Sequence, residues 1–182
     1  MKAKLFFLTV FSALTIFSYA QMEKEFVCIP CGNTCDLQTQ KSLGKCSACG
    51  MKLVDKSTIR FGNLTYEEFC KHLSSNPDAL ILDVRSPAEF KGMTQDIPSF
   101  GHFKNAVNIN ITELETRIGE IAAYKDKEVL VYCSHNHRSP QASYLLGANG
   151  FKTVNNMVGG VSTFAGKNND KLLVKTFVFH SH

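Results

Sequence analysis

Short apolar runs alternate with amphipathic segments along most of the chain. Residues 79–84 (ALILDV) and 128–133 (EVLVYC) are nearly continuous apolar runs, as expected of strands buried on both faces, and a shorter run at 152–157 suggests a final strand. The segments between them repeat apolar positions every three or four residues, which is typical of helices. This alternation predicts an α/β fold with a parallel sheet covered by helices on both faces.

Start and stop signals place the helices. Thr65 and Glu68 have the spacing of a capping box, and so do Thr112 and Glu115. The segment 139–150 (SPQASYLLGANG) opens with Ser-Pro and closes on glycine, as a helix does. We therefore expect helices to begin near residues 65, 112 and 139.

The segment 26–54 has a different composition, because it is polar and carries five of the seven cysteines. A segment this short needs a cross-link to fold. Two C-x2-C pairs, at 28–31 and 46–49, are the spacing at which two tight turns direct four thiolates to one tetrahedral ion. Two disulfides are the alternative, since four cysteines also allow two bridges.

The stretch 44–53 (GKCSACGMKL) resembles the second half of small heavy-metal-binding domains and zinc ribbons. This resemblance implies that Cys28, Cys31, Cys46 and Cys49 are metal ligands and that Cys35 is left over. Zinc is the expected ion for four thiolates, although such soft ligands also accept copper(I) or cadmium.

The first residues predict export. Residues 1–20 have two early lysines, an apolar middle and small residues at Ser18 and Ala20, which is the pattern of a secretory signal peptide cleaved after Ala20. The apolar core is shorter than the ~20 residues of a membrane span, so an uncleaved anchor is the weaker alternative and no membrane span is expected after cleavage. We therefore expect a periplasmic or secreted protein.

Charge argues against a nucleic-acid partner. The formal net charge of +4 falls to +2 without residues 1–20, and no basic run occurs in the chain. The organisation expected is a signal peptide at 1–20, a Cys-rich ribbon at 26–54, an α/β domain at 58–166 and a C-terminal tail at 167–182. Terminal His180 and His182 are expected to be solvated.

Two cysteines stand apart from the ribbon. Cys70 lies beside the apolar face of the first helix and is expected to be a small buried residue. Cys133 follows the strand at 128–133, and function in parallel sheets is found at the carboxyl ends of the strands. Cys133 is therefore the candidate for chemistry.

Residues 133–139 (CSHNHRS) connect this strand to the helix that begins near residue 139. Successive backbone N–H groups in such a connection form an anion-binding concavity, which stabilises a thiolate at its rim. Arg138 adds a fixed charge, and Asn136 tolerates a left-handed backbone. The candidate substrate-binding residues are Ser134, His135, Asn136, His137 and Ser139.

Two other interpretations of this loop stay open. Cys133 could simply be buried at a strand end beneath a solvated turn, since cysteine is often buried. Alternatively, His135 and His137 could bind a metal together with Cys133, although their close spacing makes that geometry awkward.

Residues 58–166 resemble a rhodanese domain, the sulfurtransferase module. Four segments carry the resemblance in the expected order: LILDVRSPAEF at 80–90, GHFKNAVNI at 101–109, VYCSHNHRS at 131–139 and MVGGVSTF at 157–164. Related phosphatases and arsenate reductases have a cysteine loop one residue longer than the six residues from Cys133 to Arg138. The resemblance therefore favours sulfur chemistry over oxyanion hydrolysis or reduction.

The resemblance implies a rhodanese-type sulfurtransferase. Cys133 would take sulfur from a small donor (thiosulfate, polysulfide or persulfide), form a persulfide and pass the sulfur to a thiol. Arg138 would orient the loop or bind the departing anion, whereas Asp83 and Arg85 would stabilise the fold. No cofactor is needed for this transfer. The stretch 91–100 is an insertion that either overhangs the site or lies apart from it.

The alternative function is a non-catalytic protein that binds soft metals or docks to a partner. The Cys-rich ribbon favours this alternative, while the intact loop from Cys133 to Arg138 favours the enzyme.

Overall fold

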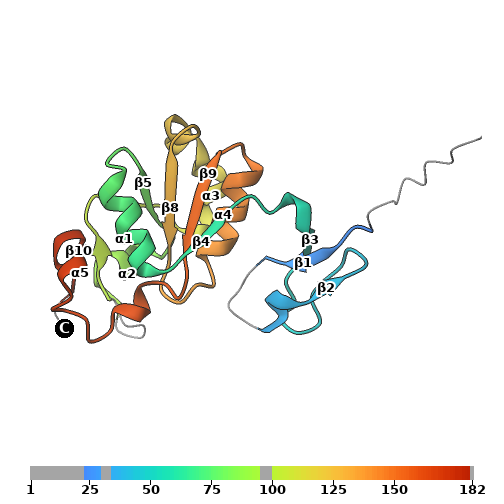
Figure 1. Ribbon diagram of the computed structural model, residues 1–182, viewed down its shortest axis with the longest axis horizontal. Coiled ribbons are helices and arrows are strands. Elements are labelled where there is room, and N and C mark those ends of the chain that lie inside the picture. Colours follow the sequence, from blue (N-terminus) through green and yellow to red (C-terminus); the bar gives the residue numbers. More distant parts are fainter. Residues whose placement is uncertain (1–22, 30–33, 95–99, 181–182) are drawn as a thin grey trace, which may run out of the picture.

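The computed structural model describes residues 23–29, 34–94 and 100–180. Figure 1 shows two bodies joined by a short connection, the Cys-rich ribbon and a larger α/β domain. The predicted signal peptide lies outside the described residues. Within the described residues, no helix combines the length and apolar character needed to cross a membrane.

A five-stranded parallel sheet forms the centre of the α/β domain, in the order β4-β9-β8-β5-β7. The strands are β4 (Gly62–Leu64), β5 (Leu80–Asp83), β7 (Val107–Asn108), β8 (Glu128–Tyr132) and β9 (Thr153–Met157). All five residues of β8 are buried, because this strand is in the middle of the sheet and both of its faces are covered. The predicted parallel sheet is confirmed.

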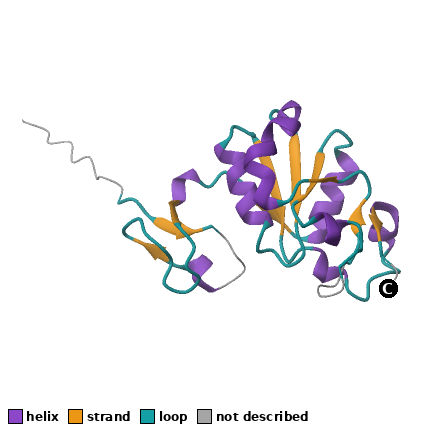
Figure 2. Cartoon of the chain, turned by 180° about the vertical axis from the view of Figure 1, so that it is seen from behind, coloured by secondary structure: helices purple, strands orange, loops and turns teal. Residues whose placement is uncertain are grey.

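Helices cover both faces of this sheet, as predicted (Figure 2). The helical elements are α1 (Tyr66–Ser75), α2 (Pro87–Phe90), α3 (Ile111–Arg117), η3 (Ile118–Tyr124), α4 (Ser139–Ala148), η4 (Val161–Phe164) and α5 (Lys171–Thr176). Alternate residues of β8 face opposite sides. Val131 packs in one apolar core with α3, η3 and α4, whereas Leu130 packs in a second core with α1 and α5.

One of the two predicted capping boxes is present. Thr65 and Glu68 form reciprocal hydrogen bonds at the start of α1. The box at Thr112 is wrong, because α3 begins at Ile111 and is capped by the side chain of Asn110, which accepts from the Thr112 N–H at 3.2 Å. Asparagine caps as well as threonine does, so the helix starts one residue before Thr112. The third helix, α4, begins at Ser139 as predicted.

The C-terminal tail is part of the domain core. Strand β10 (Phe177–Val178) pairs antiparallel with β6 (His102–Phe103), and Leu173 of α5 is fully buried. His180 is not solvated as expected, because its Nε2 lies 3.2 Å from Nδ1 of His102. His182 lies outside the described residues.

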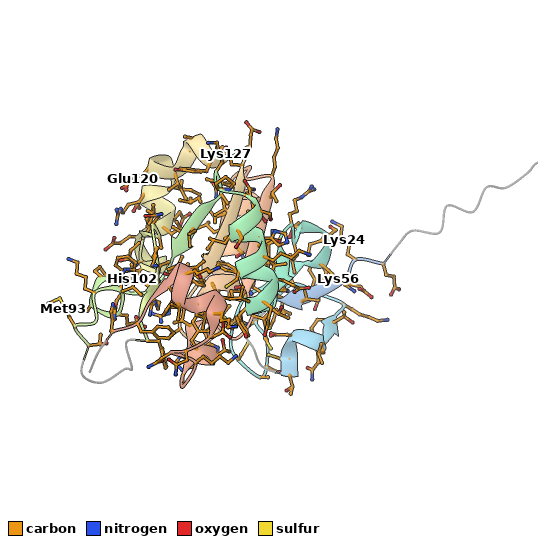
Figure 3. The ribbon with its side chains drawn as sticks, turned by 60° about the vertical axis from the view of Figure 1, so that its left-hand side comes forward. Lys24, Lys56, Met93, His102, Glu120 and Lys127 are labelled. Carbon is orange, nitrogen blue, oxygen red and sulfur yellow. The ribbon has the colours of Figure 1, made fainter. Side chains whose placement is uncertain are left out.

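The ribbon is a three-stranded antiparallel sheet in the order β2-β1-β3. Its elements are β1 (Phe26–Cys28), η1 (Thr34–Leu37), β2 (Thr39–Gln40) and β3 (Leu53–Asp55), and η2 (Lys56–Thr58) leads to the domain. In Figure 3, Lys24 and Lys56 of this part of the chain lie on the opposite side of the molecule from Met93 and His102.

Candidate active site and thiol cluster

Cys133 lies where the sequence predicts, directly after the central strand β8 and six residues before the start of α4. Its side chain has 0% exposure, and the hydroxyl of Ser139 donates to its Sγ at 3.3 Å. The thiol is therefore buried in the folded domain, in contact with the first residue of α4.

The start of the loop 133–139 is hydrogen-bonded to the two residues that follow the glycine pair at 159–160. The Val161 N–H donates to the carbonyl of Cys133 at 3.0 Å, and the Ser162 N–H donates to the carbonyl of Ser134 at 2.9 Å. Gly160 has φ 66°, and a Cβ there would lie 2.6 Å from the Cys133 carbonyl oxygen. Only glycine therefore allows this close approach of the two backbones.

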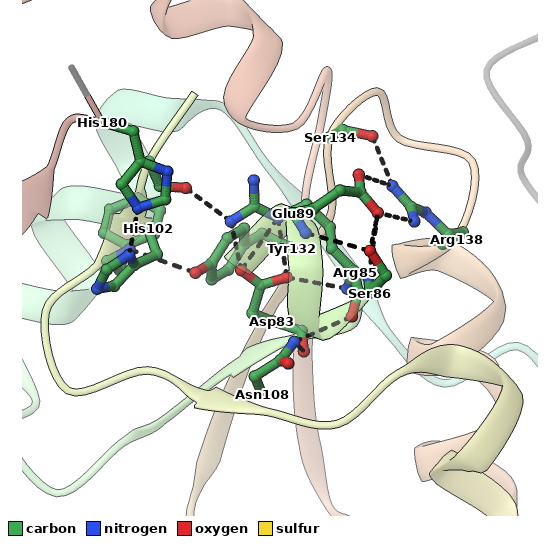
Figure 4. Close-up of polar contacts among 12 residues, drawn as sticks. Asp83, Arg85, Ser86, Glu89, His102, Asn108, Tyr132, Ser134, Arg138 and His180 are labelled. Atoms are coloured by element: carbon green, nitrogen blue, oxygen red, sulfur yellow. Dashed lines mark hydrogen bonds and ion pairs between the residues drawn. The ribbon is translucent and has the colours of Figure 1, made fainter. Parts of the chain in front are cut away.

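Arg138 stabilises the loop through an ion pair with Glu89 of α2 (Figure 4). Its Nη1 and Nη2 each donate to a Glu89 carboxylate oxygen at 2.7 Å, and Nη2 also donates to the Ser134 hydroxyl at 2.7 Å. Burial disfavours the charge on Glu89, but hydrogen bonds from Arg138 and Ser86 outweigh this and lower its pKa to about 2. These bonds link Arg138, near the end of the loop, to Ser134 at its start and to α2.

Asp83 and Arg85 form a second, fully buried ion pair beside the first. Arg85 Nη2 donates to Asp83 at 2.6 Å and to the carbonyl of Gly101 at 2.6 Å, which joins the end of β5 to the segment before β6 (Figure 4). These contacts are internal to the domain, as expected of residues that stabilise the fold.

The middle of the loop has the geometry expected of an anion site. Asn136 has a left-handed φ of 62°, a conformation that asparagine tolerates. Among the hydrogen bonds between described residues, none uses the backbone N–H of Ser134, His135, Asn136 or Arg138 as donor. These donors are available to a bound anion or to water.

The two histidines of the loop, His135 and His137, are exposed to solvent. The His135 ring lies 5.9 Å from the ring of Phe100 in an edge-to-face arrangement, and the carbonyl of exposed His137 accepts from the side chain of Gln141. The insertion 91–100 therefore returns to the active-site loop through Phe100, although residues 95–99 are outside the described part. A metal site at Cys133, His135 and His137 has no support among the described residues.

Two partners of the loop were missed from the sequence. Glu89 belongs to a recognisable capping box with Ser86, but its contact with Arg138 spans 49 positions. Asn156 of β9 donates to the side chain of Asn136 at 2.9 Å, and nothing in the local sequence indicates this contact.

A second group of thiols lies in the ribbon. The Sγ atoms of Cys28, Cys35, Cys46 and Cys49, which we name the thiol cluster, all lie within 4.8 Å of one another. Cys35 was expected to be left over, and the structure corrects this, because η1 turns its side chain to a buried position beside β1. Cys31, the remaining expected ligand, lies outside the described residues.

The geometry of the thiol cluster fits a metal ion. Cys28 and Cys49 are separated by 3.5 Å between their Sγ atoms, close to the roughly 3.8 Å edge of a tetrahedral zinc–thiolate site. The turn at 46–50 is closed by the Gly50 N–H, which donates to the Cys46 carbonyl at 2.8 Å. Cys28, Cys46 and Cys49 form no disulfide, so the two-disulfide alternative is not the arrangement seen here.

The close packing of these thiols shifts the pKa values of Cys46 and Cys28 in opposite directions. A hydrogen bond from Cys28 lowers the pKa of Cys46 to about 6. Burial, together with the neighbouring Cys46 and Cys49, raises the pKa of Cys28. A cation bound among the four sulfurs would favour the thiolate at each of them.

Comparisons with known proteins agree with this fold. The curated tRNA uridine(34) hydroxylases of Escherichia coli and Wigglesworthia glossinidia brevipalpis are 32% and 33% identical over 113 and 141 residues, which are 57% and 72% of this chain but 30% and 42% of those proteins. The chain thus spans less than half the length of these relatives.

Among solved structures, reduced Bacillus anthracis CoADR-RHD has a TM-score of 0.50 at 24% identity, covering 65% of this chain and 18% of that one. The polysulfide-sulfur transferase homodimer of Wolinella succinogenes has a TM-score of 0.48 at 28% identity, covering 62% and 80%. The rhodanese-like domain matches residues 65–167, which is more than half of the chain. The chain therefore belongs to the rhodanese-like family.

Proposed function

We propose that the protein is an exported sulfurtransferase that carries sulfane sulfur as a persulfide on Cys133. The observation that supports this most is the position of Cys133 at the base of a loop in which the backbone N–H groups of Ser134, His135, Asn136 and Arg138 have no acceptor among the described residues. Membership of the rhodanese-like family supports sulfur transfer in general. Sulfur donors and thiol acceptors are the corresponding partners.

The reaction proposed has two displacements. With thiosulfate as donor, the Cys133 thiolate attacks the outer sulfur, a new S–S bond forms, the S–S bond of thiosulfate breaks, and sulfite leaves with the electron pair. An acceptor thiolate then attacks the outer sulfur of the Cys133 persulfide and releases the Cys133 thiolate. Donors in the loop would stabilise the anionic persulfide and the departing anion.

Each part of the site has a place in this scheme. The Ser139 hydroxyl, 3.3 Å from the sulfur, donates to the thiolate before attack and after release. Arg138 acts as a positioning residue in this scheme, because three of its five N–H donors are used by Glu89 and Ser134. His135 and His137 are exposed on the loop, and they are candidates for contact with a sulfur donor.

A second candidate is the non-catalytic protein that binds soft metals or docks to a partner. Two observations favour it: the zero exposure of Cys133 and the thiol cluster of the ribbon. A thiol that no donor can reach would make the loop a structural turn.

The curated relatives, which are tRNA uridine(34) hydroxylases, are longer proteins that share this domain. Incubation of the protein with tRNA, followed by analysis of the nucleosides, tests whether it hydroxylates tRNA uridine.

We also propose zinc as the ion of the ribbon. Four buried or half-buried thiols within 4.8 Å suit a structural zinc site that closes all coordination positions with protein ligands. Such an ion would stabilise the ribbon and take no part in sulfur transfer.

The test is sulfur transfer from thiosulfate and from polysulfide to a small thiol. We expect turnover by the wild-type protein and a loss of at least about a hundredfold in Cys133→Ser, since no other thiol lies in the loop. The matched control is Cys70→Ser, because Cys70 is a fully buried thiol of the same domain whose pKa is raised by burial to about 11. Equal activity in Cys133→Ser and wild type, or none in either with any donor, would contradict the proposal.

A further inference from the structure

Three asparagine side chains connect the sheet edge to the active-site loop. Nδ2 of Asn156 in β9 donates to Oδ1 of Asn63 in β4 at 2.8 Å and to Oδ1 of Asn136 in the loop at 2.9 Å. Asn63 and Asn156 are directly opposed in the parallel pair of β4 and β9. The strands thus fix the position of the Asn156 amide, and this amide reaches the middle of the loop.

The residue that Asn156 holds is the one with unusual backbone geometry. Asn136 has φ 62°, which is unfavourable for residues with a side chain and is better tolerated by asparagine than by most. A left-handed residue between right-handed neighbours is what turns successive N–H groups toward one centre. Loss of this conformation would disperse the donors that surround Cys133.

The burial of Asn156 costs folding free energy. It is 0% exposed, and among the described residues its Oδ1 has no hydrogen-bond partner. An unpaired buried carbonyl oxygen destabilises the folded state. The side chain lies in the core of the domain, where an apolar residue would avoid this penalty, so its value lies in the two hydrogen bonds that its N–H group donates.

We propose that Asn156 is a positioning residue for sulfur transfer, which fixes Asn136 in the left-handed conformation and thereby orders the anion-binding amides around Cys133. This inference rests on the proposed function for its kinetic consequence, but the ordering of the loop is independent of it. Asn156 and Asn63 lie in β9 and β4, outside the 133–139 loop. The hydrogen bond from Asn156 to Asn136 therefore depends on the position of these two strands beside the loop.

The variant that tests this is Asn156→Leu, which keeps the branching of the side chain and removes the amide. We expect the KM for thiosulfate to rise about fivefold, the effect of one lost hydrogen bond, with kcat changed less than twofold. We also expect the folded state to be at least as stable as wild type, since the unpaired oxygen is removed.

The matched control is Asn155→Ala, because Asn155 is the neighbouring residue of β9 and donates to Glu128 instead of the loop. This control is expected to lose stability and keep the wild-type KM.

A double-mutant cycle decides whether Asn156 acts through Asn136. Glycine adopts a positive φ freely, so Asn136→Gly keeps the backbone and removes the acceptor. In that background, Asn156→Leu is expected to change KM less than twofold. A full fivefold effect in the glycine background would overturn the proposal, because Asn156 would then act by another route.

Backbone amide NMR separates this inference from the function on which it rests. In Asn156→Leu we expect the amide signals of residues 134–138 to broaden or shift, while those of the sheet stay in place. Unchanged loop signals together with an unchanged KM would overturn the inference, even in a protein that transfers sulfur. Loop signals that change in a protein without any sulfur transfer would confirm the ordering role and reject the proposed function.

Discussion

The 133–139 loop and the thiol cluster both place reactive sulfur at a tight turn, but they are assembled in different ways. The loop is fixed by residues that are distant in sequence: Glu89 holds Arg138, Asn156 holds Asn136, and Gly160 admits the backbone that holds Cys133. In the thiol cluster, four sulfurs converge from one short segment and contact mainly one another.

This difference indicates what each site needs. The loop is preorganised by the apolar cores and ion pairs of the α/β domain, so it keeps its shape without a ligand. The ribbon buries few apolar side chains besides its cysteines, and a small core of this kind does not supply enough stability alone. The ribbon is therefore expected to depend on an ion and the loop is not.

Removing the ion should give the largest effect. We expect a strong chelator, or Cys35→Ser, to unfold the ribbon, seen as collapse of the amide NMR signals of residues 34–55, while the signals of the parallel sheet and the rate of sulfur transfer stay unchanged. Structural zinc sites contribute folding free energy directly, which is why the loss should be complete.

The matched variant for this experiment is Cys31→Ser. The thiol cluster already contains four sulfurs without Cys31, so this variant is expected to retain one metal ion per chain by elemental analysis. Loss of metal in Cys31→Ser with retention in Cys35→Ser would restore the pairing expected from the sequence.

Glu89→Gln should produce the next largest effect, on the loop alone. Glutamine still caps α2 but leaves the charge of half-buried Arg138 without its partner, so we expect a loss of about 2 kcal/mol in the free energy of unfolding by denaturant. Sulfur transfer should fall roughly tenfold as the loop loosens. The control is Glu120→Gln, whose ion pair with Arg117 is exposed to solvent and should contribute much less to stability. Equal losses in the two variants would show that the buried pair has no special part in the loop.

The Glu89 carboxylate should also make the unfolding free energy depend on pH at low pH. The pKa of Glu89 is about 2 in the folded protein and about 4.3 in an unfolded chain. Its contribution to stability is therefore fully present above about pH 4.3 and is lost as the pH falls toward 2. Wild type and Glu89→Gln should thus converge in unfolding free energy across this window, and a constant difference would contradict the assigned ion pair.

Much of the α/β domain follows from local sequence. The apolar runs at 79–84 and 128–133 predicted two strands, and the segment from Cys133 to Arg138 predicted the loop, with an asparagine at 136 that tolerates its left-handed backbone. These features depend on periodicity and on the backbone preferences of single residues, which are visible without a fold.

The partners of those residues were not predictable in the same way. The pairing of Glu89 with Arg138, and of Asn156 with Asn136, depends on which strands adjoin in the sheet and on where each strand ends. The place of Cys35 in the thiol cluster depends on η1, a single short turn that lies outside the paired C-x2-C spacing. Contacts set by topology need the fold before they can be inferred.

The most direct test of the account is the intact mass of the protein after incubation with thiosulfate or polysulfide, under non-reducing conditions. We expect the wild-type protein and Cys70→Ser to gain one sulfur atom, which a thiol acceptor removes, and Cys133→Ser to gain none. A folded protein with a free Cys133 thiol that gains no sulfur from any donor, or a Cys133→Ser variant that gains as much as wild type, would contradict the claim that Cys133 carries the transferred sulfur.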